Sequence, residues 1–296
     1  MQPSGEHRLC PRVSMPGDPD DILMESREVS AETHPPHILP PPSAPSLAPR
    51  DIWKFRDLLL FLVFVPFALL VSKIVMLLGY AALRPFARWR MPVDLVQADT
   101  LFLLVQQCFF YVFILGFLFL LARFQHQQPL WKSLGWKSPS ARLVASYLAG
   151  GGELAIAASL VLLLLPDSQG FPLEKLFDSR TASFAIGAFA ITVAPVIEEL
   201  VFRGLLFAIF ERAAGMRFAV VSTAVLFAGL HVPEYWHAWN HMVMILIVGL
   251  VFSLARGVTG SLAPSIILHI GYNCLIMAGL FFSTEHFRIA TGMWAR

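Results

Sequence analysis

The chain has few charged residues and only three cysteines, and each shortage excludes a class of protein. Charged residues make up 14% of the 296 positions and hydrophobic residues 56%, whereas a soluble domain typically carries about 25% charged residues. The net charge of +2 is too small to predict a nucleic-acid partner. Cys10, Cys108 and Cys274 lie far apart, without CxxC or other metal-ligand spacing. This spacing argues against a disulfide framework and against a cysteine zinc site.

The first fifty residues contain no aromatic side chain and hold 11 of the 21 prolines. Such a composition buries too little apolar surface to offset the entropy of an ordered chain, so we predict a disordered, proline-rich tail over 1–50. The tail also lacks the short apolar core of a signal peptide. A translation start at Met15 or Met24 is the alternative interpretation of this segment.

After residue 51 the apolar residues gather in runs close to the ~20 residues that a helix needs to cross a bilayer. They predict an all-α fold, a polytopic transmembrane helical bundle of about seven spans, with the lipid bilayer as its surroundings. The predicted spans are 57–82, 99–123, 141–165, 181–210, 217–232, 240–256 and 262–283. We assign 51–180 to N-terminal transmembrane helices, 181–283 to a core that holds the polar motifs below, and 284–296 to a C-terminal tail.

The segment PVIEELVFR, residues 195–203, places three charged residues inside an apolar run. A charge near the bilayer centre costs roughly 2.5–3.5 kcal/mol on insertion scales, so such a residue tends to face the bundle interior or a water-filled cavity. Glu199 and Arg203 are four residues apart and can form an ion pair on a helix. Glu198 points about 100° away and has no such partner. Glu198 is therefore the better general base, and Glu199 the better structural partner.

Two further stretches carry polar residues at one-turn spacing. LFAGLHVP places Phe227 and His231 four residues apart, and LHIGYN does the same for His269 and Asn273. Imidazole and carboxamide groups can both donate hydrogen bonds to a developing oxyanion. Phe227 is expected to be a packing residue.

These residues predict a hydrolysis without a covalent intermediate. A water held by Glu198 and His231 could attack a peptide carbonyl. His269 and Asn273 could then stabilise the oxyanion of the tetrahedral intermediate.

The three stretches also carry a family resemblance. EELVFR matches the motif EExxxR, FAGLH matches FxxxH, and LHIGYN matches HxxxN. With these motifs in this order and in apolar surroundings, the chain resembles the CPBP family, the CAAX proteases and bacteriocin-processing enzymes, also called the Abi family. The stretch GLVFSLARGVTGSLAPSIILHIGYN also looks like the final segment of that family. The resemblance covers residues 181–278.

The resemblance implies a glutamic-type intramembrane endopeptidase, similar to the type II CAAX prenyl endopeptidases, with a site open to the cytosol. It implies that Glu198 activates water with the help of His231, and that His269 and Asn273 form the oxyanion hole. The residues that support the site would be Glu199, Arg203 and Phe227. No cofactor is implied. The substrate would be a peptide or a lipidated protein, and the protein would be a multi-pass integral membrane protein, in the plasma membrane of a bacterial source. Substrate identity and oligomeric state stay open.

Other interpretations of the same residues remain. No HExxH is present, which excludes a zincin helix, but Glu198, His231 and His269 could together hold one zinc ion. We rank that below the metal-free mechanism. The polar residues could also form a network that only fixes helix packing. Among functions, the main alternative is a non-catalytic membrane immunity or scaffold protein of the same fold. A small transporter with the glutamates as proton carriers is another, which the lack of an inverted repeat disfavours.

Two more charged residues lie in or beside predicted spans. Arg256 is expected at the membrane interface, with contact to substrate as the alternative. Glu153 follows three glycines and is expected near the membrane edge or paired with another helix, with a place in the cavity wall as the alternative.

Overall fold

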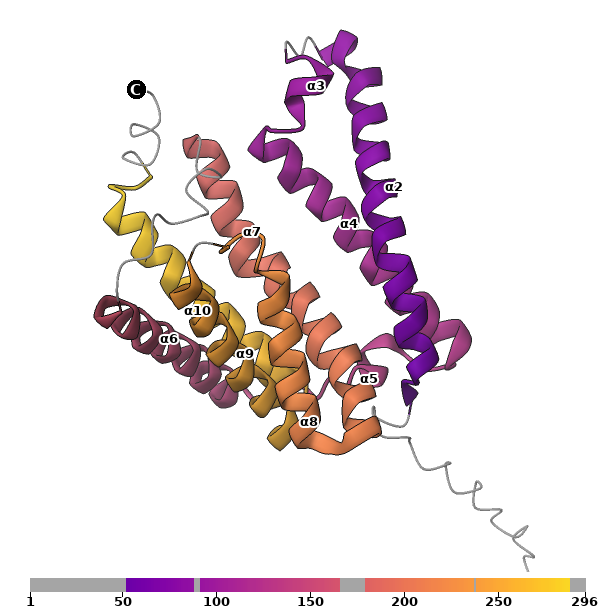
Figure 1. Ribbon diagram of the computed structural model, residues 1–296, viewed down its shortest axis with the longest axis vertical. Helices are drawn as coiled ribbons and strands as arrows, with labels where there is room; N and C mark the ends of the chain where they lie inside the picture. The colour runs from indigo at the N-terminus through magenta and orange to yellow at the C-terminus, as the bar shows by residue number, and fades with distance from the viewer. Residues whose placement is uncertain (1–51, 88–90, 166–178, 237, 288–296) are drawn as a thin grey trace, which may run out of the picture. The chain divides into compact units, whose positions relative to one another are not determined.

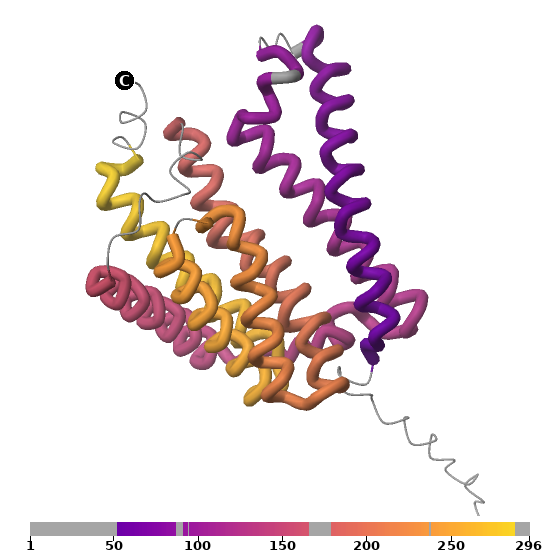
Figure 2. The backbone as a smooth tube through the Cα atoms, in the orientation of Figure 1, coloured from indigo at the N-terminus to yellow at the C-terminus, as the bar shows by residue number. Residues whose placement is uncertain are grey.

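A computed structural model describes residues 52–87, 91–165, 179–236 and 238–287. Within these ranges the chain forms helices and no strand, which confirms the predicted all-α fold (Figures 1 and 2). The α-helices are α2 (Phe55–Ala87), α3 (Val93–Val96), α4 (Thr100–Leu120), α5 (Leu130–Ser133), α6 (Ala141–Leu164), α7 (Arg180–Glu199), α8 (Phe207–Leu230), α9 (Trp239–Thr259) and α10 (Ala263–Ser283). Two segments are π-helical, η1 (Leu121–Gln125) and η3 (Leu200–Leu206). The predicted tail over 1–50 lies outside the described residues, as do 288–296 of the C-terminal tail.

Six helical stretches of the described chain are long and apolar enough to cross a membrane. They are α2, α4 with η1, α6, the continuous stretch from α7 to α8, α9 and α10. A helix of 21 residues, such as α9 or α10, is about 31 Å long, close to the thickness of a hydrocarbon core. The predicted polytopic helical bundle is therefore confirmed.

The difference between six stretches and the expected number of about seven arises at one position. The predicted spans 181–210 and 217–232 fall in a single helical stretch of 51 residues, Arg180–Leu230. Its backbone leaves helical geometry at Ala214, with φ −145°, and at Gly215, with φ 80°. A positive φ is accessible to glycine without steric cost. Figure 1 shows the chain reversing there, at the lower end of α8, so the two predicted spans are joined by a two-residue break rather than by a loop.

Helix starts follow capping chemistry where the sequence supplies it. The Asp99 side chain accepts a hydrogen bond from the Phe102 N–H at the start of α4. Ser140 and Ser179 cap α6 and α7 in the same way. Each cap satisfies an N–H group that has no partner inside the helix.

Helices α6 and α10 pack with their backbones in contact. A Cβ atom added at Gly151 would lie 2.1 Å from the carbonyl oxygen of Leu268, and one added at Gly271 would lie 2.3 Å from that of Leu148. Small residues allow such an approach between membrane helices. Because α10 carries His269 and Asn273, this contact helps to set the position of both side chains.

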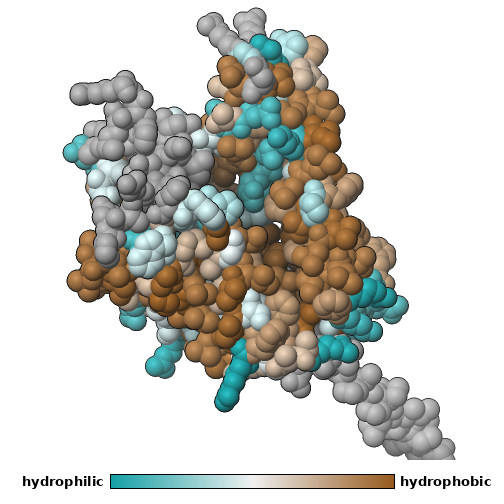
Figure 3. Space-filling view, in the orientation of Figure 1, coloured by the Kyte–Doolittle hydropathy of each residue, from teal (hydrophilic) through white to brown (hydrophobic). Residues whose placement is uncertain are grey.

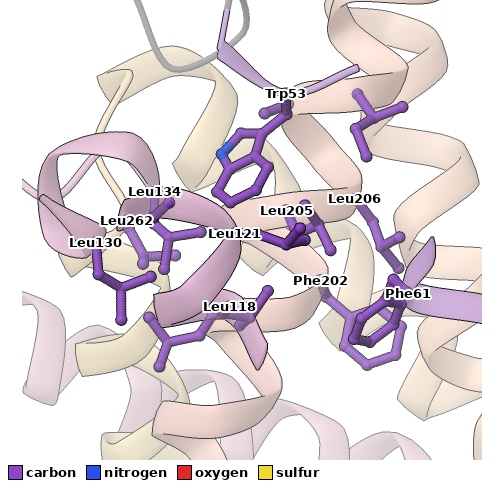
Figure 4. Packing of buried hydrophobic residues seen from close by; sticks show 14 of the residues in the cluster. Trp53, Phe61, Leu118, Leu121, Leu130, Leu134, Phe202, Leu205, Leu206 and Leu262 are labelled. Atoms are coloured by element: carbon purple, nitrogen blue, oxygen red, sulfur yellow. The ribbon is translucent and has the colours of Figure 1, made fainter. Parts of the chain in front are cut away.

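A cluster of buried apolar side chains surrounds η3 (Figure 4). Leu205 and Leu206 of η3 pack there with Leu118 and Leu134 from the N-terminal half. Gly204 allows a close approach, because a Cβ atom at that position would lie 2.9 Å from Leu134 Cδ2. The N-terminal helices therefore support the segment that follows the two glutamates.

Asp57 is a buried carboxylate near the start of α2. Its carboxylate accepts a hydrogen bond from the Lys54 N–H at 2.8 Å and another from the Gln125 side chain, and it lies 3.0 Å from His126 Nε2. These bonds join the start of α2 to the end of η1. A buried carboxylate needs such partners, and here each of them is local to the N-terminal helices.

Much of the described surface is apolar. Brown residues cover most of the coloured face in Figure 3, and large side chains such as Phe86, Leu163 and Leu164 are 79–86% exposed. Exposed apolar surface of this extent is unusual for a protein in water. It is the expected exterior of a helical bundle in lipid.

Candidate active site

The motif EELVFR lies where α7 changes into the π-helical segment η3. Glu199 is the last residue of α7, and η3 runs over Leu200–Leu206. Pro195 lies inside α7, and proline lacks an N–H and disturbs the preceding turn. Single π turns inside α-helices occur frequently at functional sites. The local geometry of both glutamates is therefore that of an interrupted helix.

Glu199 and Arg203 form the ion pair that their spacing predicts. Arg203 Nη1 donates to Glu199 Oε1 at 2.9 Å, and both side chains are fully buried. Glu199 Oε2 has no hydrogen-bond partner among the described residues. In low dielectric, loss of either partner would leave a buried charge without compensation. Removal of one partner alone should therefore destabilise the protein.

Arg203 is also bonded to helix α9. Its Nε donates to Ser253 Oγ at 3.2 Å, and its Nη2 donates to the Gly249 carbonyl at 2.8 Å. The guanidinium lies over the Phe227 ring, 4.7 Å from the centroid, a favourable cation–π geometry. Phe227 thus has the packing role predicted for it, directly against the arginine.

His269 on α10 lies between the two glutamates. Its Nδ1 is 3.0 Å from Glu199 Oε1, and its Nε2 is 3.9 Å from Glu198 Oε2. If Nδ1 donates to Glu199, a neutral ring presents a lone pair at Nε2. Donation from Nε2 to an oxyanion would then require the doubly protonated ring.

Glu198 is the more accessible of the two glutamates, with 24% of its side chain exposed. Its Oε1 accepts a hydrogen bond of 3.3 Å from the Tyr111 hydroxyl, which comes from α4. The spacing of the motif predicts no cationic partner for Glu198 within its own helix, and Tyr111 is a partner that local spacing could not reveal. Contact with solvent and the lack of an arginine partner both suit a residue that exchanges protons.

His231 lies just after the end of α8. Its Nδ1 is 2.8 Å from the Phe227 carbonyl oxygen, so Nε2 is the ring nitrogen left for other partners. Glu234 lies in the turn that follows. Burial raises the pKa of the Glu234 carboxyl above its usual range, the charge of His231 opposes that shift, and the charge of Glu198 adds to it.

Asn273 has a structural contact in addition to its predicted role. Its Nδ2 donates to the Ala190 carbonyl of α7 at 2.7 Å. A carboxamide nitrogen carries two hydrogens, so one remains for another acceptor. The residue predicted as an oxyanion donor therefore also links α10 to α7.

Arg256, in the last turn of α9, is buried in the bundle, with 3% of its surface exposed, and its expected place at the membrane interface stays a prediction. Phe207, the residue after η3, donates its N–H to the Phe202 carbonyl, five residues back. From Ala208 onward the α-helical pattern resumes, in which each N–H donates to the carbonyl four residues earlier, and for Ala208 that carbonyl belongs to Gly204. No backbone N–H is then left to donate to the Arg203 carbonyl. Arg256 Nε donates to that carbonyl at 3.0 Å. The arginine thus satisfies a carbonyl that the π segment leaves without a backbone donor.

Glu153 is exposed on α6, and Cys108 and Cys274 are partly buried free thiols. Within the described ranges no group of three or more His, Cys, Asp or Glu side chains is close enough to hold a metal ion. The predicted alternative of a zinc ion on Glu198, His231 and His269 has no preformed ligand set here.

The fold and this cluster define a class, a multi-pass helical membrane protein with a buried glutamate–arginine–histidine network. Residues 180–275 match the family model described as Type II CAAX prenyl endopeptidase Rce1-like. The match confirms the resemblance predicted from the three motifs, and its range includes every predicted site residue from Glu198 to Asn273. Neither a curated protein nor a solved structure matches the chain.

The family implies a protease of the CAAX type. Together with the six long apolar helices it indicates an integral, multi-pass membrane protein. The structure brings Glu198, Glu199 and His269 together. The catalytic roles of these residues stay predictions. Tyr111 and Arg256 are the neighbours that sequence patterns did not reveal, because their contacts join helices far apart in the chain.

Proposed function

We propose that the chain is an intramembrane endopeptidase that hydrolyses a peptide bond of a prenylated, CAAX-type protein by a metal-free mechanism. The observation that supports this most directly is that two side chains contact the same carboxylate oxygen of Glu199. Its Oε1 is bonded by Arg203 from the same helix and by His269, which is 70 positions away in the chain. This arrangement holds Glu198, the adjacent residue, beside the imidazole of His269.

In the proposed reaction Glu198 acts as the general base. A water molecule between Glu198 and His231 gives a proton to the Glu198 carboxylate as its oxygen attacks the carbonyl carbon of the substrate. The tetrahedral intermediate then collapses. The carbon–nitrogen bond breaks, its electron pair goes to nitrogen, and the proton held by Glu198 passes to the leaving amine.

His269 and Asn273 would stabilise the oxyanion of that intermediate. His269 can donate from Nε2 in its doubly protonated form, with Nδ1 on Glu199. Asn273 can donate the Nδ2 hydrogen that the Ala190 carbonyl does not use. Preorganised donors of this kind are worth roughly 10²–10³ in kcat each.

The family description and the apolar exterior support the proposed substrate class. A prenyl group is apolar and partitions into the bilayer, at about 0.8 kcal/mol for each buried CH₂ group. A substrate anchored in this way would meet a membrane-embedded site by diffusion within the membrane. In a bacterial source, the membrane concerned would be the plasma membrane.

The test uses the purified full-length chain in liposomes. Its substrates are a peptide with a farnesylated C-terminal CAAX box and the same peptide without the farnesyl group. We expect cleavage of the farnesylated peptide, located by mass spectrometry, and loss of cleavage in Glu198→Gln. Glu153→Gln is the matched control, because it changes an exposed carboxylate on α6 and should leave the rate unchanged. Wild-type activity in Glu198→Gln would refute the mechanism, and equal cleavage of both peptides would refute the lipidated substrate class.

The metal-free part of the proposal has its own measurement. The protein should carry zinc at well below one ion per chain, and its activity should resist chelators. Stoichiometric zinc together with chelator-sensitive activity that zinc restores would favour the alternative in which Glu198, His231 and His269 bind a metal ion.

A further inference from the structure

Helix α4 contributes a polar side chain to the candidate active site. The Tyr111 hydroxyl donates to Glu198 Oε1 at 3.3 Å. Tyr111 lies outside residues 180–275, the part of the chain that matches the protease family. The N-terminal helices therefore reach the residue proposed as the general base.

Tyr111 is held in place from two sides. Its ring stacks on Phe189 of α7, with centroids 5.6 Å apart and an interplanar angle of 16°. Its hydroxyl is bonded to Glu198. A phenol fixed by a ring stack and by this hydrogen bond has little freedom to turn away from Glu198.

The two oxygens of Glu198 face different partners. Oε1 accepts from Tyr111, while Oε2 faces His269 Nε2 at 3.9 Å. A carboxylate with a defined neighbour at each oxygen has a defined plane. General-base catalysis depends on that geometry, because misplacement of a reacting group by about 1 Å can cost roughly 100-fold in rate.

We propose that Tyr111 is a positioning residue for Glu198, and that its hydroxyl fixes the orientation of the carboxylate that takes the proton from water. This inference rests on the proposed function. It makes α4 a part of the active unit, so the core over 181–283 is incomplete without the N-terminal helices. The hydroxyl acts through Glu198 and has no assigned contact with substrate.

A purely structural role for Tyr111 would depend on its ring, and the proposed role depends on its hydroxyl. Tyr111→Phe separates the two, because it keeps the stack on Phe189 and removes only the hydrogen bond. Tyr80→Phe is the matched control. It removes a phenol that donates to the Met91 carbonyl, in the helical pair α2 and α3, away from the cluster around Glu198.

The experiment measures kcat and KM of the full-length chain in liposomes with the farnesylated CAAX peptide as the probe. We expect Tyr111→Phe to lower kcat by roughly 10-fold with KM changed by less than about 2-fold. Tyr80→Phe should match the wild type. Wild-type kcat in Tyr111→Phe would overturn the inference, as would a raised KM at unchanged kcat, which would indicate substrate binding.

A second pair of variants tests whether the hydroxyl acts through Glu198. In a Glu198→Asp background the shortened carboxylate is drawn away from α4. Adding Tyr111→Phe to that background should therefore lower kcat by less than about 2-fold. A full, additive 10-fold loss in that background would contradict the proposal. Phe189→Leu, which removes the ring stack but leaves the Tyr111 ring and hydroxyl present, should lower kcat by roughly 2- to 3-fold and keeps the test usable if Tyr111→Phe folds poorly.

The outcomes distinguish this inference from the proposed function. If Glu198→Gln retains full activity, the proposed function fails and Tyr111 has no base to position. If Glu198→Gln is inactive while Tyr111→Phe equals the wild type, only the role of Tyr111 fails.

Discussion

His269 and Glu199 are 70 positions apart in the chain, and His269 Nδ1 lies 3.0 Å from Glu199 Oε1. The contact determines which ring nitrogen remains for chemistry. With Nδ1 on Glu199, Nε2 is the atom that faces Glu198 and the proposed water. In the proposed reaction Glu199 would therefore act through the orientation of the imidazole rather than by contact with substrate.

His269→Ala should lower kcat by roughly 10²–10³ if the imidazole donates to the oxyanion. Arg203 still pairs with Glu199 in this variant, so the protein should remain folded. The measurement is kcat and KM with the farnesylated peptide, with thermal unfolding in detergent as the control for folding. A change confined to KM would assign His269 to substrate binding instead.

Arg203→Met should destabilise the protein strongly. It leaves the Glu199 carboxylate buried beside His269 without its arginine, and removal of one partner of a buried pair typically costs about 3–5 kcal/mol. Thermal unfolding measures the loss. Arg123→Met, at an exposed position of η1, is the control and should unfold like the wild type. Equal melting temperatures for the two variants would contradict the structural role of the pair.

Arg256→Met should destabilise η3 and lower activity, although Arg256 has no contact with the proposed water. The substitution leaves the Arg203 carbonyl without its donor, and an unsatisfied buried polar group costs about 1–3 kcal/mol. Arg217→Met, exposed on α8, serves as the control. Thermal unfolding that is unchanged in Arg256→Met would show that the carbonyl finds another donor.

Gly151→Ala and Gly152→Ala form a matched pair on α6. The added methyl group at Gly151 would lie 2.1 Å from the Leu268 carbonyl oxygen, whereas at Gly152 it would meet nothing within 4 Å. We expect Gly152→Ala to be neutral or stabilising by about 0.5–1 kcal/mol. Gly151→Ala should destabilise by about 1–3 kcal/mol and lower kcat, because α10 carries His269 and Asn273. Similar melting temperatures for the two variants would indicate that α6 and α10 do not pack this closely.

Glu234→Gln should change how stability depends on pH. The folded protein holds the proton of Glu234 more tightly than the unfolded chain, because burial raises the pKa of that carboxyl. The stability contribution is present below the unfolded pKa and is lost as pH rises through the folded pKa. The variant should therefore gain melting temperature relative to the wild type as pH rises above about 4.3, the ordinary pKa of a glutamate. The gain should be small because the side chain keeps contact with the surface, and a relative loss would contradict the sign.

The sequence predicted those parts of the fold that depend on local spacing. Apolar runs of bilayer length predicted the helices, and the four-residue spacing of Glu199 and Arg203 predicted an ion pair that the structure shows at 2.9 Å. The break at Ala214 and Gly215 was expected as a separation between two spans. Periodicity could not show that only two residues separate the two helices there.

What local spacing could not predict are the contacts between helices. Tyr111 and Glu198 are 87 positions apart, and a tyrosine in an apolar run has no pattern that distinguishes it from a packing residue. The burial of Arg256 in the bundle could not be predicted, because its partner is a backbone carbonyl. That carbonyl lacks a donor only because η3 is π-helical, and a sequence of ordinary helix formers carries no signal for that change of pairing.

The π segment also makes the geometry of this region depend on the number of residues in it. A π turn arises when a helix accommodates one residue more than regular i→i−4 pairing allows. Removal of one residue from Leu200–Leu206 would restore regular pairing and rotate the helix on one side by about 100° relative to the other. The glutamates and the apolar face around Leu205 would then point in different relative directions. Deletion of a single codon would thus be enough to move the two glutamates out of alignment with the side chains that η3 places against them.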